Sequence, residues 1–158
     1  MARRYEEFAQ RDVKLLGLSV DSIYSHLAWI DDIKTHFDVT IPFPVIADTD
    51  KQVATLYGMT TAESGTATVR TVFFIDPELT IRATLTYPAA IGRNIDELLR
   101  VIDAFQENTS SGGCAIPANW RLGDPTVTPA PATVEELRQR QETSNTPGVK
   151  AWYYKVNL

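Results

Sequence analysis

The stretch that decides the fold is Thr68-Val69-Arg70-Thr71-Val72-Phe73-Phe74-Ile75-Asp76-Pro77-Glu78. Side chains alternate along a β-strand, so this run presents two faces, and both are largely apolar. We therefore expect a central strand that is covered on both sides. The Asp-Pro pair at its end is typical of the first two positions of a β-turn.

Arg70 interrupts this apolar strand near its start. An arginine carries a permanent charge that must meet an anion or several hydrogen-bond acceptors. Two readings are open. Arg70 lies at a strand end and reaches solvent or a structural carboxylate, or it belongs to a site for an anion or a thiolate.

The composition indicates one globular domain with an appendage, since the chain has 158 residues, 44% of them apolar and 22% charged. A net charge of -5 without a cluster of Lys or Arg argues against nucleic-acid binding. No apolar run reaches the length of about 18 residues that crosses a bilayer, and the N-terminus lacks a signal-peptide core. We expect a cytoplasmic protein with no membrane partner.

The other elements follow from apolar periodicity and capping residues. Helices are expected at 2–11, after Asp21 or Ser22, at 50–57, after Asn94 and at 133–141, and strands at 13–20 and 81–87. This order predicts an α/β sheet that ends in an antiparallel hairpin and carries helices on both faces. The second helix should bury an apolar face that includes Ile23, Leu27, Ile30 and Phe37.

The return strand Ile81–Tyr87 has only one apolar face, so it is expected at a sheet edge. His26 and His36 have no acid or cysteine cluster beside them, so both are read as structural. Neither a metal nor a cofactor is expected. From Gln106 onward the composition changes to a proline-rich tail, which predicts a division into 1–106 and 107–158.

Seven blocks of the sequence carry a resemblance to a known family. They are Val13–Ser22, His26–Trp29, Ile41–Pro44, Thr68–Asp76, Tyr87-Pro88, Gly92–Asn94 and Ala115–Trp120. Together they resemble the 1-Cys, peroxiredoxin-6-like subgroup of the peroxiredoxins (the AhpC/TSA family). The resemblance implies a thioredoxin-like fold for 1–106 and the subgroup's C-terminal domain, an extended dimerisation arm, for 107–158.

The implied activity is the thiol-dependent reduction of hydrogen peroxide and organic hydroperoxides in antioxidant defence. A cysteine thiolate attacks the peroxide, and nearby positive charge lowers the pKa of that cysteine. The motif positions of the family's two arginines are Arg70, which would hold the thiolate and the peroxide oxygens, and Arg93, which would support the same pocket. The resulting sulfenic acid would be reduced by an external thiol.

The sequence departs from the family at the nucleophile. The motif Pro-Xaa-Xaa-Xaa-Thr-Xaa-Xaa-Cys is absent, and Ala2–Phe8 resembles the second half of the helix that would follow it. We therefore expect an N-terminally truncated domain that is inactive alone. Cys114, the one cysteine, is read as a linker thiol, with a resolving or intermolecular-disulfide role as the alternative.

Three functions remain open on the sequence. The first is a peroxiredoxin polypeptide without its nucleophile, which the family implies would form a homodimer through the edge strand Ile81–Tyr87 and a ring of dimers beyond it. The second is a non-catalytic module that assembles with full-length peroxiredoxin subunits. The third is a different thiol enzyme that uses Cys114.

Overall fold

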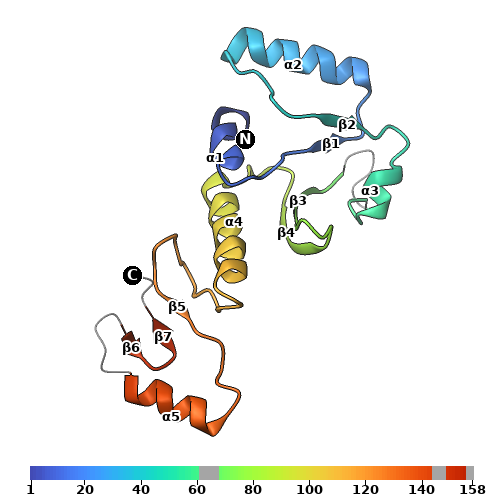
Figure 1. The fold of residues 1–158 in the computed structure, drawn as a ribbon. Coiled ribbons are helices and arrows are strands. Elements are labelled where there is room, and N and C mark those ends of the chain that lie inside the picture. The colour runs from blue at the N-terminus through green and yellow to red at the C-terminus, as the bar shows by residue number, and fades with distance from the viewer. Residues whose placement is uncertain (61–67, 144–148, 156–158) are drawn as a thin grey trace. The chain divides into compact units, whose positions relative to one another are not determined.

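The computed structural model describes residues 1–60, 68–143 and 149–155, shown as a ribbon in Figure 1. The chain forms two compact units, Met1–Ile95 and Asp96–Leu158. This division lies earlier than the boundary predicted after residue 106. A boundary between compact units and a boundary between family domains need not fall at the same residue. The predicted division after residue 106 therefore stays a prediction.

The first unit is an α/β arrangement in the predicted element order. Its elements are η1 (Ala2–Arg4), α1 (Tyr5–Ala9), β1 (Gly17–Ser19), α2 (Ile23–Phe37), β2 (Val45–Ala47), α3 (Gln52–Leu56), β3 (Arg70–Ile75) and β4 (Ile81–Tyr87). In the described residues the strands form two separate pairs, β1 with β2 and β3 with β4, rather than the single sheet expected.

The first pair is parallel, with Gly17 opposite Val45. A Cβ at Gly17 would lie 3.2 Å from a methyl of Val45, so a larger residue here would require the Val45 side chain to shift. The predicted strand at 13–20 is shortened to three residues. Its remaining residues have no strand partner among those the structure describes.

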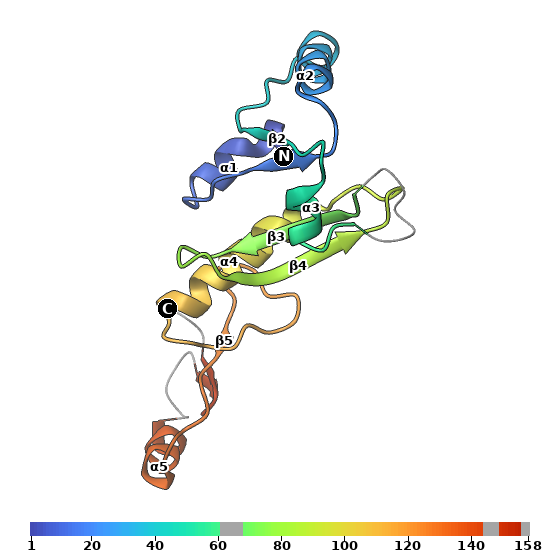
Figure 2. The same cartoon turned by 90° about the vertical axis from the view of Figure 1, so that its right-hand side faces the viewer.

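The second pair is an antiparallel hairpin in which Arg70 lies opposite Tyr87 (Figure 2). Its turn is the predicted one, because the Asp76 carboxylate accepts a bond of 2.8 Å from the Thr80 amide. The bounds of the return strand and its alternation of half-buried and exposed residues are also confirmed. The expectation of a central strand is wrong, since β3 pairs only with β4 within the described residues and Ile75 is 47% exposed.

Helix α2 begins at the predicted cap, where the Ser22 hydroxyl accepts a bond of 3.2 Å from the Ser25 amide. Its predicted burial is wrong, because Ile23, Leu27 and Phe37 are each about 60% exposed. The apolar arc of this helix is wider than the strip that meets the β1–β2 pair. Periodicity shows that a helix has an apolar side and does not show how much of it is covered.

Asp48 joins β2 to α3 and is 4% exposed. Its two carboxylate oxygens accept bonds from the amides of Val53, at 3.1 Å, and Ala54, at 2.7 Å. Backbone bonds then run from Met59 to Ala54 and from Val69 to Met59. The Asp48 carboxylate therefore fixes the start of α3. The backbone bonds through Met59 then connect this helix to Val69, the residue immediately before β3.

The second unit contains most of α4 (Ile95–Ser110), then β5 (Thr126–Val127), α5 (Val134–Glu142), β6 (Val149–Ala151) and β7 (Tyr154–Lys155). The strands form an antiparallel sheet in the order β5-β7-β6. Its buried apolar residues are Leu98, Leu99, Ile102, Cys114 and Trp120. The predicted Thr133 cap is confirmed by a bond of 3.1 Å from the Glu136 amide. In the three described ranges, no helix has the length and apolar character that crossing a membrane requires.

Candidate functional site

Arg70 occupies the first position of β3 and is half-buried. Its Nη1 donates a hydrogen bond of 3.0 Å to the backbone carbonyl oxygen of Ile91. Among the described residues this partner is a backbone carbonyl and not a structural carboxylate, and the anion or thiolate reading stays a prediction. The guanidinium uses one of its five N–H groups on the carbonyl, and no other described residue takes up the remaining ones.

Arg93 follows this carbonyl by two residues and precedes α4. No hydrogen bond or ion pair reaches its side chain from residues 1–60, 68–143 or 149–155. Partial desolvation lowers the pKa of Arg93 from its usual value, the like charge of Arg70 lowers it further, and Tyr87 raises it. The structure therefore brings the two predicted arginines together, with Tyr87 beside them.

The first residues of the chain lie close to this pair. Burial lowers the pKa of the Met1 amino group first, and the positive charges of Arg4 and Arg93 lower it further. The Arg4 charge is shared with Glu7, to which its Nη2 donates at 2.8 Å. The beginning of η1 thus lies near Arg93, and the positive charges of Arg70 and Arg93 favour an anion such as a thiolate.

Ser19, Asp21 and His26 form a cluster with the composition of a catalytic triad. The Ser19 hydroxyl donates to Asp21 Oδ2 at 2.7 Å and lies 2.7 Å from His26 Nε2. A hydroxyl has one proton, so Nε2 must be the donor in the second bond. In a triad the histidine instead accepts the serine proton. This cluster therefore anchors the start of α2 and does not activate a nucleophile.

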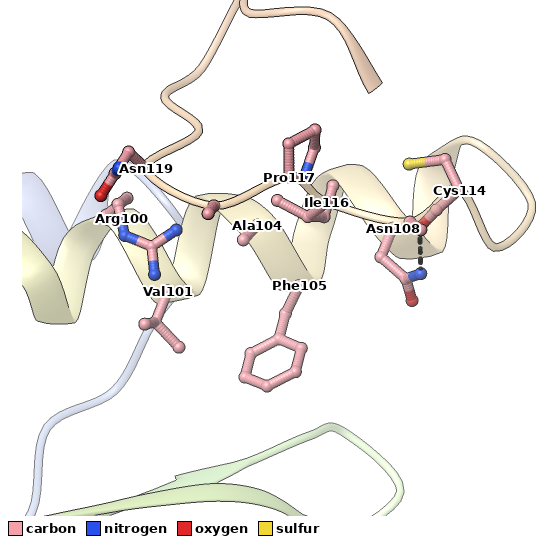
Figure 3. A pocket seen from close by; sticks show the side chains of 11 residues that line it. Arg100, Val101, Ala104, Phe105, Asn108, Cys114, Ile116, Pro117 and Asn119 are labelled. Atoms are coloured by element: carbon pink, nitrogen blue, oxygen red, sulfur yellow. Dashed lines mark hydrogen bonds between the residues drawn. The ribbon is translucent and has the colours of Figure 1, made fainter. Parts of the chain in front are cut away.

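Cys114 lies in the second unit, in a cavity of about 470 Å³ between α4 and the segment that runs back along it (Figure 3). The residue is 3% exposed, and its thiol faces the Glu107 carbonyl oxygen at 3.9 Å. Asn108 fixes the Cys114 backbone by donating to its carbonyl at 2.7 Å. Cys114, which was read as a linker thiol, is therefore a buried residue of this unit's core.

Among the described residues that line this cavity, none is a free cation that could stabilise a thiolate. Arg100 lines it but makes a two-point ion pair with Glu97, with Nη2 at 2.8 Å from Oε1. That bond to Glu97 raises the pKa of Arg100. No trio of His, Cys, Asp or Glu in the described part of the chain could hold a metal ion.

Sequence reasoning missed two parts of the site. The Ile91 carbonyl is a backbone group, so no residue type signals it. Tyr87 was assigned only to the apolar side of the return strand, although its position opposite Arg70 follows from the hairpin register. A simple count back from the turn would have placed Thr86 there, because the register shifts by one residue between Phe74 and Ile75.

Comparisons with known proteins assign the chain to a family. The AhpC/TSA family matches residues 1–84, and the C-terminal domain of 1-Cys peroxiredoxin matches residues 104–144. The chain belongs to the peroxiredoxin family. It is 51% identical to a peroxiredoxin of Thermoplasma volcanium over 96% of the chain and 72% of that protein. It is 52% identical to peroxiredoxin 2 of Thermoplasma acidophilum over 96% of the chain and 74% of that protein.

Solved peroxiredoxin structures confirm the predicted thioredoxin-like fold. A mutant of peroxiredoxin 6 from Arenicola marina aligns with a TM-score of 0.80 at 31% identity, over 99% of the chain and 76% of that structure. A yeast mitochondrial 1-Cys peroxiredoxin gives 0.80 at 38% identity, over 99% and 75%. Because relatives align with nearly all of the chain, the comparisons give no support to the expectation that it is a truncated, inactive form.

Proposed function

We propose that this peroxiredoxin chain takes part in the thiol-dependent reduction of hydroperoxides, with Arg70 and Arg93 as the cationic side of the site. The observation that carries the proposal is the Arg93 guanidinium, which has no partner among the described residues and lies beside a second arginine. Two like charges held together without an acid repel each other. A ligand with negative charge relieves this repulsion, as a thiolate or a departing alkoxide would.

The reaction transfers two electrons from thiols to the peroxide. A thiolate attacks one peroxide oxygen, the O–O bond breaks, and the other oxygen leaves as hydroxide or alkoxide and takes up a proton. The cysteine becomes a sulfenic acid. One external thiol then releases water and forms a mixed disulfide, and a second thiol frees the cysteine as the external disulfide forms. Charge develops on the leaving oxygen, where a positioned arginine stabilises it most.

The experiment measures peroxide consumption with a thiol reductant in two arms. One arm uses the chain alone, and the other adds a synthetic peptide that carries the family motif Pro-Xaa-Xaa-Xaa-Thr-Xaa-Xaa-Cys. Arg93→Gln should lower the rate by about 100-fold, the effect of removing one oxyanion donor. Cys114→Ser shows whether Cys114 is the nucleophile. A rate that is insensitive to Arg93 in both arms would contradict the proposal.

The external reductant is proposed to be a small thiol or a thioredoxin. The yeast mitochondrial 1-Cys peroxiredoxin has a thiol resolving mechanism that works through glutathione and thioredoxin systems. Our chain aligns with 75% of that structure, which supports the same chemistry here. Rates with glutathione and with a thioredoxin system, compared at equal peroxide, test this assignment.

A second candidate function is assembly through β4, either into homodimers and rings or with full-length peroxiredoxin subunits. It is favoured by β4 itself, which has one hydrogen-bonded neighbour among the described strands. A free strand edge presents unpaired backbone groups to another chain. Native mass spectrometry of the chain, alone and mixed with the T. acidophilum relative, should show dimers and mixed oligomers. Protection of the 81–87 amides on assembly would identify this edge.

A further inference from the structure

The tip of the β3–β4 hairpin presents an exposed apolar group. Leu79 is 86% exposed, and Ile75 and Ile81, which lie opposite each other beside the turn, are each about half exposed. Leu79 also has a left-handed backbone, with a φ of 62°. Leucine rarely adopts this conformation, which glycine and asparagine reach more easily. The turn therefore holds an apolar side chain outward in a strained conformation.

Hydrogen bonds within the turn fix the conformation of this tip. The Leu79 amide donates to the Asp76 carbonyl oxygen, and the Asp76 amide donates to the Thr80 carbonyl oxygen, each at 3.0 Å. The Asp76 carboxylate also accepts from the Thr80 amide at 2.8 Å. A surface that is held in one conformation loses little conformational entropy when it binds. The tip is therefore suited to contact another surface.

A second exposed apolar segment lies at the opposite end of β4. The four residues that follow the strand are all exposed and apolar: Pro88, Ala89, Ala90 and Ile91. The Ile91 amide donates to the Pro88 carbonyl oxygen at 2.9 Å, which closes the segment into a turn. Between the two groups, β4 has one hydrogen-bonded neighbour among the described strands, β3 (Figure 2). One apolar group therefore lies at each end of this strand edge.

Antiparallel pairing of two copies through β4 brings these unlike ends together. When the strand pairs along its full length, Ile81 lies opposite the second copy's Tyr87, and Leu79 lies opposite the second copy's Ala89. A slip of two residues, the smallest that keeps the same faces together, places Leu79 opposite Tyr87 or Ile91 instead. Each of these registers sets the tip against the apolar turn. The contact occurs twice, because the arrangement has two-fold symmetry.

Charge favours the same arrangement. The tip carries Glu78, an exposed acid whose side chain has no partner among the described residues. The turn 88–92 is followed by Arg93, and Arg70 donates to its Ile91 carbonyl oxygen at 3.0 Å. Pairing through β4 therefore brings an acid of one copy toward two arginines of the other. Opposite charges across a contact steer the encounter and disfavour other registers.

We propose that the tip 76–80 of one copy docks on the turn 88–92 of a second copy, with Leu79 against Ala89 and Ile91, when two β4 strands pair. The inference rests on the second candidate function, assembly through β4, and deepens it by naming the side chains and the register. A bare strand edge offers backbone groups to any other strand. Complementary ends select a second copy of the same chain.

The first experiment forms a disulfide between copies. Leu79→Cys and Ala89→Cys are mixed in equal amounts under mild oxidation, and the cross-linked dimer is measured by mass spectrometry. Within one chain β4 separates the two positions by about 20 Å, whereas a disulfide requires Cα atoms within about 7 Å. Two copies of one position lie at opposite ends of the paired strands, so the mixture should give several-fold more cross-link than either variant alone. The wild type corrects for Cys114, which is 3% exposed.

The second experiment measures the dimer dissociation constant by sedimentation equilibrium. Leu79→Asn removes the apolar contact and keeps the turn, because asparagine accepts the left-handed conformation. Leu56→Asn is the matched control, since Leu56 is 82% exposed and lies on α3. Burial of one leucine corresponds to about tenfold to a hundredfold in a binding constant. Kd should therefore rise by at least about tenfold in Leu79→Asn and stay unchanged in Leu56→Asn.

The inference and the functions on which it bears can fail separately. Absence of the cross-link between positions 79 and 89, or an equal Kd in Leu79→Asn and Leu56→Asn, would overturn the docking of the tip. If the 81–87 amides of such dimers are still protected, assembly through β4 stands. A chain that forms no dimer refutes both. Neither measurement uses peroxide, so the proposed peroxide reduction is tested independently.

Discussion

Substitution of Asp48 by alanine tests how much this side chain contributes to the stability of the unit that carries Arg70 and Arg93. Asp48 is 4% exposed, and its carboxylate accepts two backbone bonds at the start of α3, at 3.1 and 2.7 Å. Removal leaves both amides without this acceptor. Bonds to charged groups contribute about 1.5–3 kcal/mol each, and loss of a helix cap costs about 0.5–2 kcal/mol. Because one carboxylate makes both bonds, we expect a loss of about 3 kcal/mol in all.

Urea denaturation followed by circular dichroism measures this loss. In a domain of this size a change of about 3 kcal/mol also lowers Tm by about 6–12 °C. Asp50→Ala is the matched control, since Asp50 is an exposed acid two residues away that binds Gln52. It should change stability by less than about 0.5 kcal/mol. A loss below about 1 kcal/mol in Asp48→Ala would refute the role assigned to the buried carboxylate.

Two further predictions concern packing and pH. Phe8→Ala should cost about 3–5 kcal/mol by urea denaturation, because Phe8 is 1% exposed, whereas Phe37→Ala, at 59% exposed, should cost far less. The Thr80 amide first, and then Arg82, hold the pKa of Asp76 below its usual 3.8. The Asp76 carboxylate therefore stabilises the hairpin above about pH 4, and this stability is lost as pH falls through the lower, folded-state pKa. Between pH 5 and 2 the wild type should lose more stability than Asp76→Asn, and equal losses would contradict this assignment.

The sequence by itself determined the local features of this protein. The return strand Ile81–Tyr87 was predicted with its bounds and its alternation, and Ser22 and Thr133 were predicted as helix caps. Each depends on residues within a few positions along the chain, where backbone geometry links residue type to structure. The family resemblance likewise followed from short blocks in order, and it named Arg70 and Arg93 before their surroundings were known.

Only the tertiary structure decided the long-range contacts. Arg70 bonds to a carbonyl 21 residues away, and no side chain announces that acceptor. Cys114 was read as a linker thiol and is 3% exposed, whereas the apolar side of α2 was expected in a core and is largely exposed. Whether an apolar group is covered depends on which segments return to meet it. The burial of an apolar group is therefore set by the folded chain as a whole. Periodicity describes only one segment, so it cannot predict that burial.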